Sequence, residues 1–365
     1  MRNIVDYART EFRSFDEKPF GPVDSLILSQ LSYIHFEGVV PGFEPGAAPV
    51  RLADCNRAEC FETMFHFVRD APNSLRLLQA AAASPRFRNI RATMYISDFD
   101  PKSDKQFSAL TFLLPDGTAY LAFRGTDDTL VGWKEDFMMA FVCPVPSQTQ
   151  AAFYLSEAFL RLNGPILLGG HSKGGNLAVY AALTANETVR RRIAAIYDHD
   201  GPGFREGVLD CDSYAQIEPL IQKTVPQSSI IGMLLEGHRK YTVVESSRIG
   251  VMQHDPFSWK LADSAFLTSE EVTDGAQYMD RTIRDWVNNM DDAERERFTD
   301  ILFGILDAGD AGSFAEMNRQ WRKNYTAIFS AIVDADPDMK KFIRQLIRDF
   351  AALMVKNLKS QKSST

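Results

Sequence analysis

The chain has 365 residues, of which 45% are apolar and 24% charged, so it can bury a sizeable core in one large domain with additions or in two domains. A net charge of −8 argues against a nucleic-acid partner, because phosphate binding depends on clustered lysine and arginine side chains. The four cysteines lack metal-ligand or disulfide-framework spacing, so we expect reduced thiols, no metal and no cofactor.

The sequence contains no segment typical of a signal peptide or of a membrane span. Residues 1–20 carry charges throughout and have no apolar stretch typical of a signal peptide. No uncharged apolar run approaches the roughly 18 residues that a membrane span needs. We therefore expect a cytoplasmic protein. Residues 359–365, KSQKSST, are expected to form a disordered tail.

Residues 1–90 are predicted to form a helical N-terminal layer. Asp24 can cap the segment SLILSQLSYIHF, since aspartate accepts hydrogen bonds from the free backbone N–H groups of a first helical turn. The segments ETMFHFVRDA and SLRLLQAAAA carry apolar residues at helical spacing. These helices are expected to pack against the rest of the chain.

Residues 91–260 alternate short β-type runs with helices, a pattern typical of a mainly parallel sheet flanked by helices. The first strands are ATMYISDF, FSALTFLL and TAYLAFRG, with PDG as a turn. A helix from about Ser147 to Asn163, capped by Ser147 and stopped by Gly164, leads into the strand PILLGG. The helix GNLAVYAALTAN and the strands RIAAIYDHDG and KYTVVES follow.

Residues 261–358 are predicted to be a helical region packed on this core. The apolar positions lie at helical spacing and are Tyr278, Ile283, Trp286, Met290, Phe342, Leu346, Phe350 and Leu353. We expect the N- and C-terminal helices to cover the sheet and form a cap. An alternative is that the last helix rests on an anionic membrane surface through Lys340, Lys341, Arg344, Arg348 and Lys356.

The segment Gly170-His171-Ser172-Lys173-Gly174 matches the G-x-S-x-G pattern of a nucleophile elbow. An apolar strand enters it and a helix-forming segment of small residues leaves it, which is the context the motif requires. The flanking Gly170 and Gly174 remove side chains that would collide with strand or helix. The pattern predicts Ser172 as a nucleophile; the alternative is a structural glycine-rich turn.

An oxyanion hole needs two N–H groups at the same sheet edge. One comes from the residue after the nucleophile, which is Lys173, through its backbone rather than its side chain. The other comes from an upstream loop, and Thr126 in the segment AYLAFRGTDD, at the end of a strand, is the candidate.

These residues resemble those of class 3 lipases and, more closely, of an uncharacterised bacterial group of lipase-like proteins. The matching residues are Phe123, Arg124, Gly125, Thr126, Trp133 and Asp136, with the elbow from Gly170 to Gly174. The resemblance to the lipases covers about residues 95–260 and implies an α/β-hydrolase fold, ester hydrolysis, Ser172 as nucleophile and Thr126 in the oxyanion hole. Trp133 and Asp136 are expected to brace that loop; for Asp136 the alternative is a helix-surface carboxylate.

The base is sought after the nucleophile, because the chain order in this fold is serine, acid, histidine. The candidates are His199, His238 and His254. His254 is favoured because it follows the last strand-like run and precedes a helical region. His238 is the second choice, and His171 is expected to point away from Ser172.

The acid departs from the lipase pattern. Class 3 lipases place an aspartate in an N-D-I/V-P-like segment, and the comparable stretch here, residues 225–231, has serine instead. Either the acid has moved, with Asp200 in YDHDG the best candidate, or the triad is incomplete. We expect Asp198 to point to the other side; Asp255, Glu236 and Glu245 remain possible. For Asp200 the alternative is a turn that caps the strand.

The sequence therefore predicts a serine hydrolase of lipase or esterase type, acting on a small-molecule acyl ester or a lipid through Ser172, His254 and Asp200. A noncatalytic scaffold that binds a lipid or small molecule is the alternative. Hydrolysis of a thioester or amide is a third possibility, because the same triad supports it.

Overall fold

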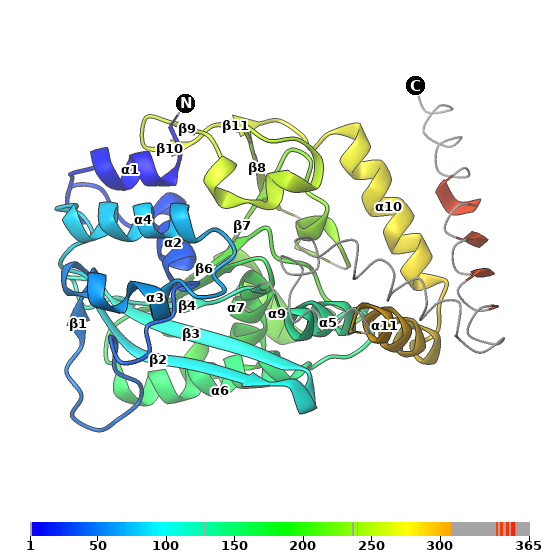
Figure 1. The fold of residues 1–365 in the computed structure, drawn as a ribbon, viewed down its shortest axis with the longest axis horizontal. Coiled ribbons are helices and arrows are strands. Elements are labelled where there is room, and N and C mark those ends of the chain that lie inside the picture. Colours follow the sequence, from blue (N-terminus) through cyan, green and yellow to red (C-terminus); the bar gives the residue numbers. More distant parts are fainter. Residues whose placement is uncertain are drawn as a thin grey trace.

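The computed structural model describes residues 2–307 except 128, 236 and 239, together with 341, 344, 345, 348, 349 and 352–354. In this part of the chain a nine-stranded sheet has the order β1-β2-β3-β4-β5-β6-β7-β8-β11 (Figure 1). Strands β4 to β8 are parallel, while β1 to β4 pair antiparallel and β11 pairs antiparallel with β8. The predicted α/β fold with helices flanking a mainly parallel sheet is confirmed.

The strands of this sheet are β1 (Val50–Arg51), β2 (Arg91–Asp100), β3 (Lys105–Leu113), β4 (Ala119–Phe123), β5 (Ile166–His171), β6 (Ile193–His199), β7 (Ile221–Pro226), β8 (Tyr241–Val244) and β11 (Thr268–Ser269). A separate two-stranded sheet contains β9 (Leu261–Ala262) and β10 (Ala265–Phe266). The central strands are the most deeply buried: β4 and β5, the latter with the sequence ILLGGH, have no exposed residue. Such nearly continuous apolar runs are expected where helices cover both faces of a parallel sheet.

Helices cover the two faces of the sheet in two groups. The N-terminal helices are α1 (Ile4–Thr10), α2 (Pro22–Leu31), α3 (Phe61–Met64) and α4 (Ala71–Ala83). The others are α5 (Leu130–Met138), α6 (Pro146–Arg161), α7 (Lys173–Thr184), α8 (Glu187–Arg190), α9 (Asp212–Ile217), α10 (Asp274–Asn288) and α11 (Asp292–Asp307). Helix α2 packs on β4, β5 and β6, and helices α6 and α7 lie on the opposite face (Figure 1).

Two large apolar clusters hold these layers together. One joins the N-terminal helices to the sheet and includes Leu26 and Phe112. The other lies between the sheet and the helices α6 and α7 and includes Phe123 and Leu177. Because residues 1–90 share a core with the sheet, they form a layer of the same folded unit; the exact boundaries at residues 90 and 260 remain a prediction.

Some predicted boundaries are wrong, and proline explains two of them. Helix α2 starts at Pro22 with Gly21 as its N-cap, so Asp24 lies in the first turn, where its carboxylate accepts a 3.0 Å hydrogen bond from Gly21 N. Helix α6 starts at Pro146, which places Ser147 inside the helix. Proline is favoured at the first helical position, since its fixed backbone angle suits that position and its missing N–H has no intrahelical partner there.

Other differences concern the lengths of elements. The segment ETMFHFVRDA forms only the short helix α3, and α4 begins at Ala71, where Asp70 accepts a hydrogen bond from Asn73 N at 3.1 Å. Strand β7 was not among the predicted elements. Its sequence, IQKTVP, mixes polar and apolar residues and gives no continuous apolar signal, although most of it is buried.

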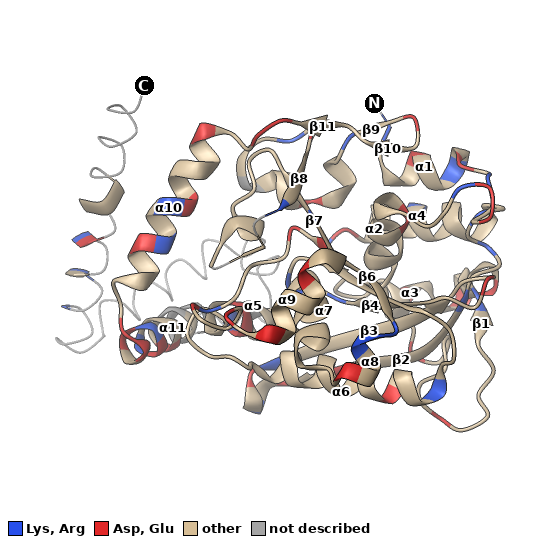
Figure 2. Cartoon of the chain, turned by 180° about the vertical axis from the view of Figure 1, so that it is seen from behind, with Lys and Arg blue, Asp and Glu red and all other residues tan. Residues whose placement is uncertain are grey.

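The C-terminal region begins with α10 and α11, which lie beside the carboxyl end of the sheet (Figure 1). Helix α10 contains both acidic and basic residues, coloured red and blue along its ribbon in Figure 2. The predicted final helix, with Lys340, Phe342, Leu346, Phe350 and Lys356, lies mostly outside the described residues, as do residues 359–365. In the part that is described, no helix has the length and apolar character needed to cross a bilayer.

Candidate active site

Ser172 stands at the sharp turn between strand β5 and helix α7. Its backbone has φ 59° and ψ −136°, and a positive φ of this size is rare for residues other than glycine. The turn is possible because its neighbours have no side chains: a Cβ on Gly170 would overlap the backbone of Gly174, and one on Gly174 would overlap Phe123 O. The local sequence thus folds as a strand, a strained serine and a helix, as predicted.

His254 lies next to Ser172. It ends a short 3-10 helix, Gly250–His254, and its Nε2 is 2.9 Å from Ser172 Oγ. Its Nδ1 is 2.6 Å from Asp200 Oδ2. Since the carboxylate only accepts, Nδ1–H donates to it and Nε2 is left to accept the serine proton. All three side chains are buried, with exposed fractions of 7% for Ser172, 7% for His254 and 0% for Asp200.

Asp200 reaches His254 because strand β6 ends one residue earlier, at His199. Residues two apart share a face of a strand, so alternation alone would have put Asp198 and Asp200 on the same side. Asp200 instead has φ 55° and leaves the strand direction. Its second carboxylate oxygen, Oδ1, accepts a 2.5 Å hydrogen bond from Ser229 Oγ, and Ser229 itself accepts one from Gly232 N. Ser229 belongs to the stretch in which the class 3 lipases carry their aspartate.

The other carboxylates considered from the sequence have different partners. Asp198 pairs with Lys223 at 2.7 Å and accepts from Gly201 N. Asp255 lies 3.0 Å from an Arg248 nitrogen, and Glu245 pairs with Lys260 at 3.1 Å. Glu236 is not among the described residues.

The remaining candidate histidines lie away from Ser172. His238 makes its 2.8 Å hydrogen bond with the Tyr214 hydroxyl. His199 lies 2.9 Å from Ser25 Oγ inside the core, where burial lowers its pKa to about 3. A histidine that stays neutral in an apolar core is a packing residue.

His171 has a position that the sequence analysis did not anticipate. It donates from Nε2 to the backbone oxygen of His254 at 2.8 Å, and its Nδ1 is 3.1 Å from the Tyr33 hydroxyl. The two imidazole rings lie 4.5 Å apart. Burial, together with the nearby His254, lowers the pKa of His171 well below its usual value, so it stays neutral. Through its hydrogen bond to the backbone oxygen of His254, His171 holds the segment that carries the base.

The loop with Thr126 approaches the elbow closely. A Cβ on Gly125 would overlap the Tyr33 hydroxyl and the His171 carbonyl oxygen and would lie 3.1 Å from Ser172 Cβ, so only glycine fits. Thr126 Oγ1 donates a 2.5 Å hydrogen bond to Asp136 Oδ2, which links the loop to helix α5. Burial raises the pKa of Asp136 to about 6. Asp136 is therefore bonded to the loop that it was expected to brace.

The side chain of Lys173 is fully buried, which its position after Ser172 did not indicate. Its Nζ lies 2.8 Å from Glu135 Oε2 and donates to Gln106 O at 3.0 Å. Glu135 is also fully buried and accepts a hydrogen bond from Ser147 N at 2.8 Å. This ion pair joins the start of α7 to α5, the helix whose Asp136 accepts the hydrogen bond from Thr126. Arg124 is buried beside this loop, 3.7 Å from Asp127.

Two cavities meet at Ser172, which is the residue they share. The first, of about 380 Å³, is apolar and is lined by Ser172, Trp133, Phe137, Ile283, Trp286 and Phe298, among others. The second, of about 280 Å³, is more polar and includes Ser172, Thr126, His254, Arg69, Arg248 and Asp255. We refer to them as the apolar cavity and the polar cavity. Helices α10 and α11 contribute to the first, and the N-terminal layer contributes to the second.

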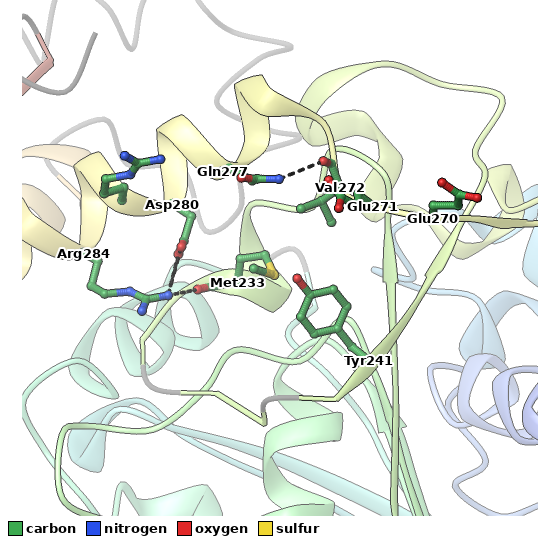
Figure 3. Close-up of a pocket in the computed structure, with 9 residues that line it drawn as sticks. Met233, Tyr241, Glu270, Glu271, Val272, Gln277, Asp280 and Arg284 are labelled. Atoms are coloured by element: carbon green, nitrogen blue, oxygen red, sulfur yellow. Dashed lines mark hydrogen bonds and ion pairs between the residues drawn. The ribbon is translucent and has the colours of Figure 1, made fainter. Parts of the chain in front are cut away.

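A larger cavity, of about 560 Å³, lies between α10 and the strands β8 and β11 (Figure 3). In it, Arg284 of α10 pairs with Asp280 at 2.9 Å and donates to Met233 O at 3.3 Å. None of the residues described there is a serine, cysteine or histidine, so this cavity lacks the serine–histidine pair that is found at Ser172. Among the described residues there is likewise no group of three or more histidine, cysteine, aspartate or glutamate side chains placed to hold a metal ion.

Comparisons with known proteins identify a family for this chain. A family model described as Mbeg1-like matches residues 81–304. The native lipase propeptide complex of Rhizomucor miehei is 15% identical, with a TM-score of 0.34, over 47% of this chain and 59% of that chain. A deletion mutant of the same complex is 14% identical, with a TM-score of 0.36, over 49% and 68%. The chain thus spans less than two thirds of the native lipase complex that it matches.

A search of curated proteins found no match. The family model covers more than half of the chain and includes the elbow, His254 and helix α10. The chain therefore belongs to the Mbeg1-like family, which is a lipase-like family.

Proposed function

We propose that the protein is a serine hydrolase that cleaves carboxylic esters, with Ser172 as nucleophile, His254 as general base and Asp200 as the residue that orients His254. The observation that carries the proposal is the continuous hydrogen-bonded chain from Ser172 Oγ through His254 to Asp200, at the junction of two cavities. Nucleophile, base and orienting acid within hydrogen-bond reach are the geometry that activates a serine.

The chemistry proceeds in two steps. His254 Nε2 takes the proton of Ser172 Oγ as the oxygen attacks the acyl carbon, and the N–H groups of Thr126 and Lys173 stabilise the oxyanion. The tetrahedral intermediate collapses when His254 returns the proton to the leaving alcohol, which leaves an acyl-serine. Water, deprotonated by His254, then attacks the acyl-serine, and Ser172 is released with the carboxylic acid product.

The alternative of a noncatalytic scaffold drew its support from the missing lipase aspartate. Asp200 Oδ2 lies 2.6 Å from His254 Nδ1, and an acid beside the base favours catalysis over a noncatalytic scaffold. The closing experiment is labelling of the purified protein by a fluorophosphonate probe, which reacts covalently with activated serines. We expect strong labelling of the wild type, none in Ser172→Ala, and at least about a hundredfold slower labelling in His254→Ala.

The matched control is Ser156→Ala, which removes an exposed serine of α6 and should label at the wild-type rate. A folded wild-type protein that stays unlabelled, under conditions that label a known esterase, would contradict the proposal. Equal labelling of Ser172→Ala would show that another residue reacts.

A further inference from the structure

The two cavities at Ser172 differ in chemistry and in which parts of the triad they contain. His254 lines the polar cavity and is absent from the described lining of the apolar cavity. Thr126 lines the polar cavity, while Asp136, to which it is bonded, lines the apolar one. The line between the two cavities therefore passes through Ser172 and the proposed oxyanion hole. A substrate with its scissile carbonyl at Ser172 must extend one group into each cavity.

His254 decides which group enters which cavity. In ester cleavage the histidine that deprotonates the serine next protonates the leaving oxygen, so the leaving group must lie on the histidine side. That side is the polar cavity. The acyl chain then extends away from His254, into the apolar cavity.

The apolar cavity suits an alkyl chain. Its walls come from three places: α5 contributes Trp133 and Phe137, α10 contributes Ile283 and Trp286, and α11 contributes Phe298. Moving a methylene group from water into such surroundings is favourable. Longer acyl chains should therefore react faster until the cavity is full.

The polar cavity contains two arginines, and only one of them is paired with a carboxylate. Arg248 is paired with Asp255 at 3.0 Å. The other carboxylate there, Asp70, accepts hydrogen bonds from Asn73 as the N-cap of α4. Among the described residues none forms an ion pair or hydrogen bond with the exposed Arg69 side chain, whose positive charge lowers the pKa of the neighbouring His171. A guanidinium facing a cavity in this way is suited to bind a phosphate or carboxylate.

We infer that the substrate is an acyl ester whose leaving group carries an anion, with the acyl chain in the apolar cavity and the anion at Arg69 and Arg248. This inference rests on the proposed function, because it names the substrate class of the same serine. Phosphate and carboxylate share the chemistry that the arginines recognise, and the experiment separates them.

The test compares three esters with the same acyl chain: 1-octanoylglycerol, which is neutral, its 3-phosphate, and 3-octanoylglycerate, which carries a carboxylate. We expect kcat/KM for at least one anionic ester to exceed that of the neutral ester by about tenfold or more at low salt, the range of a charge-assisted hydrogen bond. The anionic arm that shows the preference identifies the anion. The preference should shrink as salt is added, because both arginines are exposed.

Variants locate the preference on the molecule. Arg69→Gln and Arg248→Gln should each bring the ratio of kcat/KM between anionic and neutral esters towards one. Arg88→Gln, at an exposed arginine that lines none of the described cavities, is the matched control and should keep the ratio. On the acyl side, Ile283→Trp should shift the preferred chain to shorter esters, and Ile283→Ala should not.

The outcomes separate this inference from the proposed function. Equal kcat/KM for neutral and anionic esters, or a preference that Arg69→Gln and Arg248→Gln both leave intact, would overturn the inference while ester hydrolysis stands. Fluorophosphonate labelling of Ser172 without hydrolysis of any of the three esters would also overturn it. Absence of both labelling and hydrolysis would overturn the proposed function as well.

Discussion

Ser229 Oγ donates a 2.5 Å hydrogen bond to Asp200 Oδ1, on the carboxylate whose other oxygen faces His254. Ser229 follows strand β7, and Asp200 follows strand β6, the neighbouring parallel strand. Carboxyl ends of parallel strands meet at one sheet edge, so an acid can move from one strand end to the next and still reach the same histidine. Ser229, which follows β7, therefore lies close enough to hold the carboxylate of Asp200, which follows β6.

This relationship predicts the effect of exchanging the two side chains. Asp200→Asn should lower kcat on a short ester by about 10²–10⁴-fold, because His254 loses the partner that fixes its tautomer. The double variant Asp200→Ser with Ser229→Asp places the carboxylate after β7 instead of after β6. We expect its kcat to be at least tenfold above that of Asp200→Ser alone. Circular dichroism of each variant checks its fold. No gain in the double variant would show that residue 229 cannot present a carboxylate to His254.

A second prediction concerns His171, which donates to the backbone oxygen of His254. His171→Phe keeps an aromatic ring but removes the donor, so the His254 segment should shift. Because small misplacements of a catalytic group are costly, kcat should fall by about 10–100-fold with little change in KM. His66→Phe, at an exposed histidine, is the control and should leave kcat and KM unchanged. A raised KM with unchanged kcat would indicate a role in substrate binding instead.

A third prediction concerns the buried ion pair between Lys173 and Glu135. Removing one partner leaves an uncompensated buried charge, so Glu135→Leu should lower the free energy of unfolding by about 3–5 kcal/mol. Replacing both, with Lys173→Met and Glu135→Leu, should restore much of that loss. Urea denaturation measures each variant. Arg191→Ala, which breaks an exposed pair with Glu187, should cost less than about 1 kcal/mol. A double variant as unstable as the single one would argue against the buried-charge explanation.

A fourth prediction follows from the pKa of Asp136, which burial raises from 3.8 to about 6. Between these pH values the folded protein holds a proton that the unfolded chain has released, so this group makes the free energy of unfolding decrease as pH rises from about 4 to 6. The full effect is roughly 2–3 kcal/mol. In Asp136→Asn this contribution should disappear, so the variant gains stability relative to the wild type as pH rises. A constant difference between the two from pH 4 to 8 would contradict the pKa shift.

The sequence by itself determined the parts of this protein that depend on neighbouring residues. The elbow is local: an apolar strand, glycines and a helix-forming segment are contiguous from Ile166 to Thr184, so its geometry could be predicted. The alternation of strands and helices determined the α/β fold for the same reason. The chain order of the triad left three histidines after Ser172, and His254 was favoured among them because it follows the last strand-like run and precedes a helical region.

Only the tertiary structure decided which carboxylate faces His254. Asp198, Asp200, Glu245 and Asp255 are alike as chemical groups, and their partners come from other strands and loops, so no local pattern separates them. The early end of β6 at His199 turns Asp200 towards the base, and Ser229 stabilises it there. Helices α2 and α6 begin earlier than predicted, because proline is favoured at the first helical position.

The surroundings of Ser172 likewise depend on contacts that no local sequence pattern indicates. The apolar cavity joins residues from α5, α10 and α11, and the polar cavity joins Arg69 to Arg248 across almost half of the chain. The buried partner of Lys173 lies in a helix that precedes it by 38 residues. Contacts of this kind join residues that are far apart in the chain, and they form when whole helices and strands pack together. The sequence indicates the individual helices and strands, whereas their packing decides which side chains meet.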